Sequence, residues 1–279
     1  MATVSANAGT PAANALPQAP QLVAGQATVV QSGSRMDINQ SSAKVIINWN
    51  AFNIGSAAQV NFNQPSSSSV ALNRVVGIDQ SAIFGKLNAN GQVFLINPNG
   101  VIFGRGAQVD VGGLVASTMR ITDSDFLSGN YRFTRDGSIG SVLNEGSLYG
   151  KYIALLAPEV INDGLIVANL GTVALAAGEK TTLSIAGQQL LAVEVDKATL
   201  DMLVENRKAI VANEGMVILS AQAVNKLMGR VINSGTVEAN GITANGGTIR
   251  LEASHNIQQT GTLAANGAQN PAFDNLFAE

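Results

Sequence analysis

Short apolar alternations run along most of the chain, and each is bounded by Gly, Ser or Asn, as in residues 27–31 and 36–40. Successive side chains of a β-strand point to opposite faces, so this period of two predicts strands of about four to six residues. Residues 1–20 are rich in Ala, Pro and Asn and have no periodicity, and they are predicted to be a flexible lead-in.

From about residue 80 the apolar stretches recur around a turn that contains Asn followed two residues later by Gly. We expect the Asn side chain to bond to its own backbone, and the Gly to take a positive φ. A repeat of about 20 residues is typical of a solenoid in which each unit forms one coil. Val, Ile and Leu between the turns favour strands of a parallel sheet, so the chain is predicted to be all-β, a parallel β-helix. The turn residues are Asn144, Asn162, Asn213 and Asn233.

Two stretches depart from this period and favour helices. Residues 196–207 begin with Asp as an N-cap and place Leu200, Leu203 and Val204 on one face. Residues 220–229 begin with Ser and end at Gly, which is also typical of a helix. Both are predicted to be short helices packed on the flank of the solenoid.

The composition excludes several classes of function. Charged residues make up 13% of the chain, against about 25% in an average globular protein. The net charge of −3 leaves no basic footprint for nucleic acid. The chain has no Cys and a single histidine, His255, so the common zinc, haem and thiol chemistries lack their ligands. We therefore expect no metal, no cofactor and no nucleic-acid partner.

The same pattern predicts no targeting segment in this chain. No stretch of about 18 apolar residues is present, so no membrane-spanning helix is predicted. The first residues have neither a basic n-region nor an apolar h-region, so no signal peptide is predicted within this chain.

The most distinctive string is residues 91–104, where an apolar strand enters Asn97-Pro98-Asn99-Gly100 and a second apolar strand leaves it. Pro98 fixes φ at the second position of a turn, and Gly100 closes it. We call these four residues the NPNG turn. On physical grounds it is a rigid corner, and a rigid corner can also serve in recognition.

Six stretches in order resemble the N-terminal secretion domain of two-partner-secretion (TPS) exoproteins, the family that includes filamentous haemagglutinins and high-molecular-weight adhesins. The similarity runs from about residue 20 to about residue 265. Asn73, Arg74 and the segment before the NPNG turn resemble the adhesin branch more closely. The six stretches are residues 21–27, 46–55, 60–65, 71–75, 91–100 and 112–118.

The resemblance implies a right-handed parallel β-helix with an N-terminal cap and short extra-helical β and α elements. It implies that residues 21–270 form the secretion domain, and that residues 271–279 begin a downstream passenger. Within the family, Asn97, Pro98, Asn99 and Gly100 match the secretion motif, and Asn73 with Arg74 match a second signature. Trp49, Phe52 and Phe62 are expected to close the core at the capped end.

The resemblance also implies a function. The domain would direct a large exoprotein, an adhesin or haemagglutinin, to an outer-membrane β-barrel transporter whose periplasmic POTRA domains bind it. The chain would pass through the general secretory translocon and the periplasm of a Gram-negative bacterium. It would then fold as a monomer at the cell surface and nucleate the β-helix, and its signal peptide is absent from this chain. The absence of Cys is consistent with this route, because a disulfide formed in the periplasm would block passage of the chain through a pore.

Two other classes of function remain open on the sequence. A β-helical polysaccharide-active enzyme needs paired acids, and Glu145 and Asp163 lie 18 residues apart in equivalent turns, although solvated corner residues explain them more simply. A module that binds a host receptor or a haem carrier is the second alternative. Residues 123–125 and Asp136 superficially resemble a calcium loop but lack the bidentate Glu, so we predict no metal site and no catalytic residue there.

Overall fold

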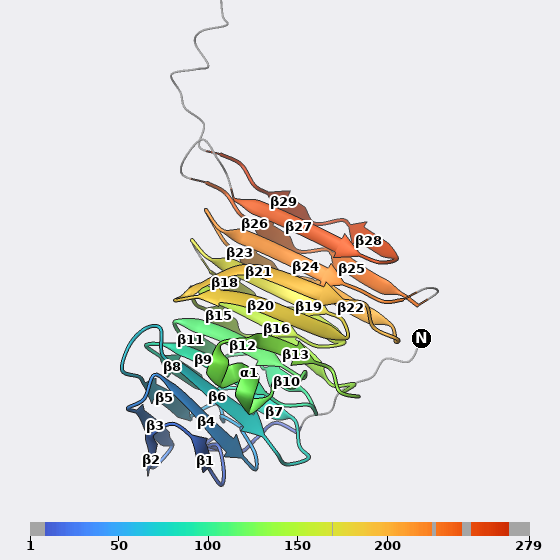
Figure 1. Ribbon diagram of the computed structural model, residues 1–279. Helices are drawn as coiled ribbons and strands as arrows, with labels where there is room; N and C mark the ends of the chain where they lie inside the picture. Colours follow the sequence, from blue (N-terminus) through green and yellow to red (C-terminus); the bar gives the residue numbers. More distant parts are fainter. Residues whose placement is uncertain (1–8, 169, 225–226, 242–246, 268–279) are drawn as a thin grey trace, which may run out of the picture.

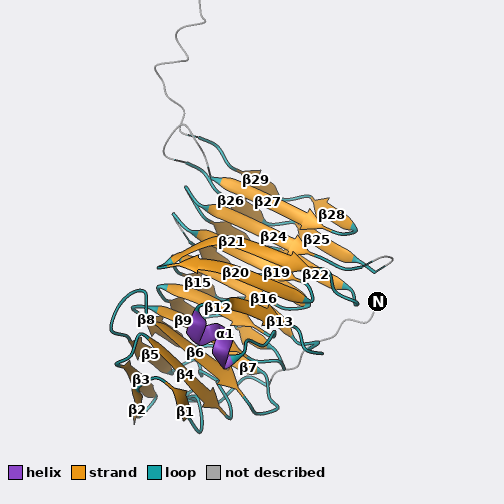
Figure 2. Cartoon of the chain, in the orientation of Figure 1, coloured by secondary structure: helices purple, strands orange, loops and turns teal. Residues whose placement is uncertain are grey.

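The computed structural model describes residues 9–168, 170–224, 227–241 and 247–267. Within them the chain winds into a parallel β-helix whose coils stack from the first strands to the last (Figure 1). In the described part of the chain strands dominate, and one short helix lies on the outside (Figure 2). The predicted fold class, an all-β right-handed parallel β-helix with a cap and extra-helical elements, is confirmed.

Each complete coil adds one strand to each of three long sheets, which we call sheets I, II and III. The chain passes from sheet II to sheet III and then to sheet I before it starts the next coil. Sheet I consists of β1 (Gln21–Ala24), β4 (Lys44–Trp49), β6 (Val70–Val75), β9 (Gln92–Ile96), β12 (Gly113–Ser117), β16 (Tyr152–Leu156), β19 (Thr172–Ala177), β24 (Met216–Ala221) and β27 (Thr248–Ala253).

The other two sheets complete the helix. Sheet II consists of β7 (Ser81–Ile83), β10 (Val101–Phe103), β14 (Ser141–Asn144), β17 (Glu159–Asn162), β22 (Met202–Asn206), β25 (Gly229–Asn233) and β28 (Asn256–Gln259). Sheet III consists of β2 (Ala27–Ser32), β3 (Arg35–Gln40), β5 (Gln59–Asn63), β8 (Lys86–Ala89), β11 (Gln108–Asp110), β15 (Ser147–Tyr149), β18 (Leu165–Val167), β23 (Ala209–Val211), β26 (Thr236–Glu238) and β29 (Thr262–Ala264).

An outer layer covers part of sheet I. It comprises the helix α1 (Asp123–Ser128) and an antiparallel sheet of β13 (Tyr131–Thr134), β20 (Lys180–Ala186) and β21 (Gln189–Asp196). Strands beneath this layer are buried on both faces: in β9, Val93 and Leu95 point into the helix, whereas Phe94 and Ile96 point into the outer layer. This double burial explains the continuous apolar run before the NPNG turn.

The first coil is closed by antiparallel strands. β1 pairs with β4 and β2 pairs with β3, which ends the parallel ladder on that side. Residues 9–20, which we expected to be a flexible lead-in, pack on this coil: Leu16 is buried, and Gln18 forms a β-bridge with Ala51. Their backbone groups bond to the first corner, where Gly55 N donates to Ala15 O at 2.9 Å. Residues 1–8 lie outside the described residues, as do 271–279, the expected start of the passenger.

A ladder of buried amides follows the ends of sheet II strands. Nδ2 of Asn144 donates to Oδ1 of Asn162, that of Asn162 to Asn206, and that of Asn206 to Asn233, each at 2.7 Å. The ladder continues from Asn233 Nδ2 to Gln259 Oε1 at 2.9 Å. Three of the four predicted turn residues therefore stack in one column. Asn213 lies at a different corner, between β23 and β24, and Asn206 completes the column.

Glycine is required at these corners for a reason other than the positive φ that was expected. Gly164 does not adopt a positive φ, and a Cβ placed there would clash with the carbonyl oxygen of Gly146 on the preceding coil. The corner demands Gly because successive coils approach closely, which leaves no room for a side chain. The expected Asn-to-backbone bond is present, since Gly146 N donates to Asn144 Oδ1 at 3.1 Å.

Both predicted helices are wrong. Residues 196–207 contain the end of β21 and the strand β22, in which Met202, Val204 and Asn206 are buried in alternation. Residues 220–229 contain the end of β24 and the start of β25, and their other described residues are not helical. These segments form strands rather than helices because they pair with neighbouring strands of the parallel sheets, where side chains alternate between the two faces. The helix forms instead at residues 123–128, in the stretch that superficially resembles a calcium loop.

Candidate functional site

The NPNG turn connects β9 of sheet I to β10 of sheet II. Gly100 N donates to Asn97 O at 3.0 Å, which closes a four-residue β-turn. Asn99 does not have a positive φ, so the turn is type I, the type that favours Asn first, Pro second and Gly fourth. Gly100 has φ +126°, a conformation that L side chains rarely adopt. The sequence therefore specifies each position of this corner.

Asn97 is buried and satisfied inside the corner. Its Nδ2 donates to Asp79 O and to Ser81 Oγ, both at 3.0 Å. Its Oδ1 accepts from Asn99 N at 3.0 Å. A buried amide with its donors and acceptors occupied holds its neighbours in place. The exposed parts of the turn are Asn99 and part of Pro98.

Two loops pack against the turn. Loop 76–80, between β6 and β7, is tied to it because Asn99 Nδ2 donates to Gly77 O at 3.0 Å. Loop 135–140, between β13 and β14, is tied to it because Ser138 Oγ donates to Pro98 O at 2.7 Å. The turn thus sets the conformation of both neighbouring loops.

Asn73 and Arg74 lie on β6 and point to opposite sides of sheet I. Asn73 is buried inside the helix, where its Oδ1 accepts from Trp49 Nε1 at 3.0 Å. Arg74 points outward and binds α1: its Nη2 is 2.6 Å from Asp123 Oδ1 and donates to Ile121 O at 3.2 Å. The two residues of this signature therefore have separate structural roles.

The two motifs meet at one groove. Arg74 pairs in register with Ile96, the residue before the NPNG turn, so the motifs occupy neighbouring strands of sheet I. Between them and the outer layer lies a groove of about 880 Å³ to which Arg74, Pro98 and Asn99 all contribute. Asn97, Gly100 and Asn73 do not line it.

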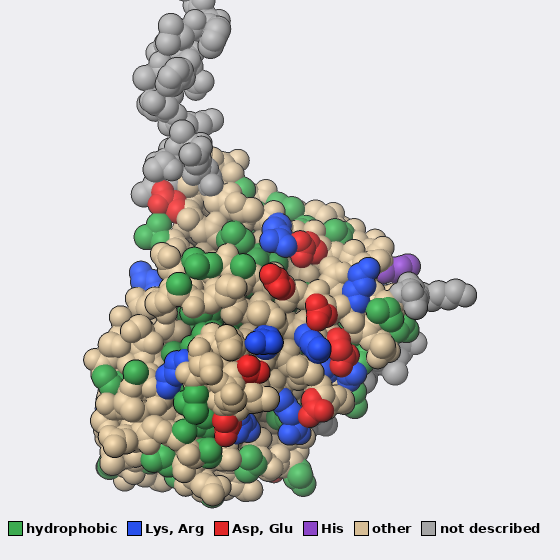
Figure 3. Space-filling view, viewed as in Figure 1, with side chains coloured by type: hydrophobic (Ala, Val, Ile, Leu, Met, Phe, Trp, Pro, Cys, Tyr) green, Lys and Arg blue, Asp and Glu red, His purple; other side chains and the backbone are tan. Residues whose placement is uncertain are grey.

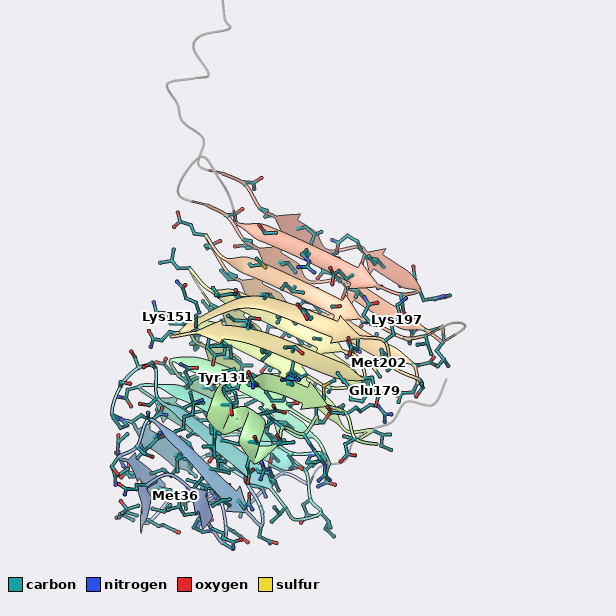
Figure 4. The ribbon with its side chains drawn as sticks, in the orientation of Figure 1. Met36, Tyr131, Lys151, Glu179, Lys197 and Met202 are labelled. Atoms are coloured by element: carbon teal, nitrogen blue, oxygen red, sulfur yellow. The ribbon has the colours of Figure 1, made fainter. Side chains whose placement is uncertain are left out.

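Lys44 makes a contact with α1 that the sequence pattern did not indicate. Its Nζ donates to Phe126 O and Leu127 O at the C-terminal end of α1, both at 2.9 Å. It also lies 5.6 Å from the ring centres of Phe126 and Tyr131, and Tyr131 lies against α1 (Figure 4). Burial lowers the pKa of the Lys44 ammonium. Lys44 is 82 residues from Phe126 in sequence, and no local pattern announces such a contact.

The aromatic side chains expected at the cap are all in the interior. Trp49, Phe52 and Phe62 are almost completely buried in the core of the helix. The rings of Trp49 and Phe52 meet edge to face with centroids 5.5 Å apart. Together they fill the helix next to the antiparallel closure.

The candidate acids lie at successive corners of the helix. Glu145 follows β14 and Asp163 follows β17, two strands that pair in register. Glu145 forms an ion pair with Arg105, with Nε and Oε1 3.3 Å apart. Residues 123–125, which superficially resembled a calcium loop, lie instead in α1. Across the described residues, no group of three or more acidic or His side chains is arranged to hold a metal ion, and no helix is long and apolar enough to span a membrane.

Solved structures with this architecture define the class of protein. The HMW1 secretion domain from Haemophilus influenzae matches 90% of this chain and 74% of its own, with 28% identity and a TM-score of 0.74. The filamentous hemagglutinin secretion domain has the same fold, with a TM-score of 0.56 and 15% identity over 88% of this chain and 98% of its own. The class is therefore that of secretion-domain β-helices.

The chain belongs to the TPS secretion domain family, which it matches over residues 13–265. It is 38% identical over 224 residues to the heme/hemopexin-binding protein of Haemophilus influenzae strain Rd, a match that covers 76% of this chain and 24% of that protein. A second Haemophilus influenzae heme/hemopexin-binding protein is 44% identical over 131 residues, 47% of this chain and 14% of its own. The chain thus spans a quarter or less of these relatives.

Membership gives the function of the domain. It is the secretion-targeting domain of a large exoprotein, and TPS domains are recognised by cognate outer-membrane transporters. Exoproteins of this kind pass through the periplasm to the cell surface or the extracellular space.

Proposed function

We propose that this domain is bound by the periplasmic POTRA domains of its transporter after the chain has passed the general secretory translocon. It then folds at the cell surface of a Gram-negative bacterium and nucleates the β-helix that follows. The observation that carries this proposal is the family match over residues 13–265, which spans the coils and the NPNG turn. This role requires neither catalysis nor a cofactor.

The full-length exoprotein is proposed to bind haem or hemopexin. The relatives that support this assignment are named heme/hemopexin-binding proteins. Because the chain spans a quarter or less of their length, that activity is assigned to the region beyond this domain. Haem titration of this chain alone is expected to show no specific binding, and stoichiometric binding would contradict the assignment.

The NPNG turn is proposed to act in secretion by fixing its two neighbouring loops. Replacing Asn97 with Ala removes the bonds to Asp79, Ser81 and Asn99. We expect a loss of about 1–3 kcal/mol of unfolding free energy, because the buried Ser81 hydroxyl and two partly buried backbone groups lose their partner. Circular dichroism during urea unfolding measures this loss.

Secretion of the same variant tests the role itself. The chain is given a signal peptide and expressed with or without its cognate transporter, and secreted protein is measured in the medium. We expect transporter-dependent secretion of the native chain and reduced secretion of Asn97→Ala. Asn213→Ala is the matched control, because Asn213 also serves a corner by accepting from Asn240 N at 3.0 Å. Secretion that does not need the transporter would contradict the proposed function.

A further inference from the structure

Loop 76–80 holds aliphatic side chains in water. Ile78 is 90% exposed and Val76 is 59% exposed, and Ile78 is the most exposed of the large hydrophobic side chains in the described residues. Single exposed aliphatic residues are common, but these two lie two residues apart on one loop. The NPNG turn fixes this loop through bonds to the carbonyl oxygens of Gly77 and Asp79.

The same side chains form one wall of the groove described above. Val76, Ile78 and Pro98 line this apolar wall. The opposite wall belongs to the outer layer and carries charges of both signs, with Arg120 and Asp136 paired at 3.4 Å and with Arg132 and Lys180 beside them. Figure 3 shows Lys, Arg, Asp and Glu interspersed over the face that carries the outer layer. One apolar wall and one charged wall fit an amphipathic segment.

The groove exists only in the folded domain. Its lining residues come from four parts of the chain that are distant in sequence: the end of β6 with loop 76–80, the end of β9 with the NPNG turn, the segment from Arg120 to Asp136, and β20. It therefore cannot serve while the chain is unfolded in transit. A partner of the groove must be present where and when the domain folds.

The transporter meets that condition. The match covers 24% of the first relative, and a chain of that length would still be crossing its transporter when this domain has emerged. The groove is lined by residues of β6, β13 and β20 and of the loops beside α1. These elements lie apart from the last described coil, β27 to β29 (Figure 1), so an occupant leaves that end free. We propose that the groove binds an amphipathic segment of the cognate transporter once the domain has folded. This proposal rests on the proposed function.

Two isoleucines provide a matched test. Ile139 is 84% exposed in loop 135–140, which is also tied to the NPNG turn, but it does not line the groove. Binding of the folded chain to purified cognate transporter in detergent is measured for Ile78→Asn and Ile139→Asn. We expect Ile78→Asn to weaken binding about tenfold or more and Ile139→Asn to change it less than about twofold.

Val76→Asn and Val30→Asn form a second pair. Val30→Asn is the control, because Val30 on β2 is similarly exposed, at 52%, but lies outside the groove. Only Val76→Asn is expected to weaken binding. Thermal unfolding followed by circular dichroism checks that all four variants fold. Equal affinities within either pair would overturn the groove as the binding site.

An unfolded sample separates the two proposals. The chain is diluted from urea directly onto the transporter, so that binding before folding is measured. If only the unfolded chain binds, the groove proposal fails and the proposed function stands. If neither form binds and secretion does not need the transporter, the proposed function fails as well.

Discussion

The first and last coils of the β-helix are built in opposite ways. The first coils are filled by Trp49, Phe52 and Phe62 and closed by the antiparallel strands β1 and β2. The last described coil, β27 to β29, continues the aliphatic stacks, but Ile257 is 44% and Leu263 is 40% exposed. Of the described strands, none pairs with the outer edges of that coil. The first coil is thus closed by antiparallel strands, and we call this end the seal. The last described coil presents an edge on which parallel strands can pair.

The seal is expected to depend most strongly on Trp49. Trp49→Ala removes the largest fully buried side chain and leaves the buried amide of Asn73 without its donor. We expect a loss of about 3–5 kcal/mol of unfolding free energy. Urea unfolding followed by circular dichroism measures it. Trp49→Phe, which keeps most of the volume, is expected to cost less, and equal losses would show that volume does not govern the seal.

The amide ladder is expected to matter most in its middle. Asn162→Ala leaves Asn144 Nδ2 and Asn206 Oδ1 unpaired in the interior. We expect a loss of about 2–4 kcal/mol, because each orphaned buried group costs about 1–3 kcal/mol. Gln259→Ala, at the exposed end of the ladder, is expected to cost less than about 1 kcal/mol. Equal costs in urea unfolding would contradict a ladder that weakens toward the last coil.

The ladder also shows where sequence reasoning reaches its limit. Asn144 and Asn162 are 18 residues apart and could be paired by eye, whereas Asn162 and Asn206 are 44 apart. The intervening residues include β20 and β21, which leave the helix and form the outer sheet. An insertion of that size hides the period, so the sequence pattern points to Asn213, which lies at another corner, and gives no sign of Asn206.

The rest of the site was predictable only where the signal is local. The NPNG turn was readable because turn geometry depends on neighbouring residues. The helix α1 was also within reach, since Thr122 caps it and Gly129 ends it with φ 80°, but the acidic residues suggested a loop. Contacts of Lys44 and Arg74 with α1 depend on tertiary packing over 82 and 49 residues and have no local signal.

The middle of the molecule differs from both ends because the outer layer covers sheet I there. Substitution of Tyr152 tests how much this cover contributes to stability. Tyr152 is fully buried beneath this layer, and its hydroxyl donates to Gln92 Oε1 at 2.6 Å. Burial raises the pKa of Tyr152 well above its ordinary value. Tyr152→Phe is expected to cost about 1–2 kcal/mol at neutral pH, because Gln92 loses a donor.

The pH dependence of the same pair follows from the direction of the shift. The stability contributed by a group with a raised pKa is fully present below the ordinary tyrosine pKa of about 10 and is lost as pH rises above it. Unfolding free energy of the native chain should therefore fall above pH about 10, and less steeply in Tyr152→Phe. Equal slopes in the native chain and in Tyr152→Phe would contradict the assignment of this pH dependence to Tyr152.

The open end should be the least sensitive part of the helix. Ile257 stacks on Val231, and Leu263 stacks on Val237, in the preceding coil. Ile257→Ser and Leu263→Ser are expected to cost about 0.5 kcal/mol or less, because these side chains are partly exposed and a terminal coil can fray without unfolding its neighbours.

Val231→Ser and Val237→Ser are the matched controls one coil further in. Both valines are fully buried, and each substitution is expected to cost about 2–3 kcal/mol. Urea unfolding together with hydrogen exchange of β28 and β29 separates local fraying from global loss. If the outer pair costs as much as the inner pair, the last described coil is covered in solution, and it cannot serve as the edge on which the next coil forms.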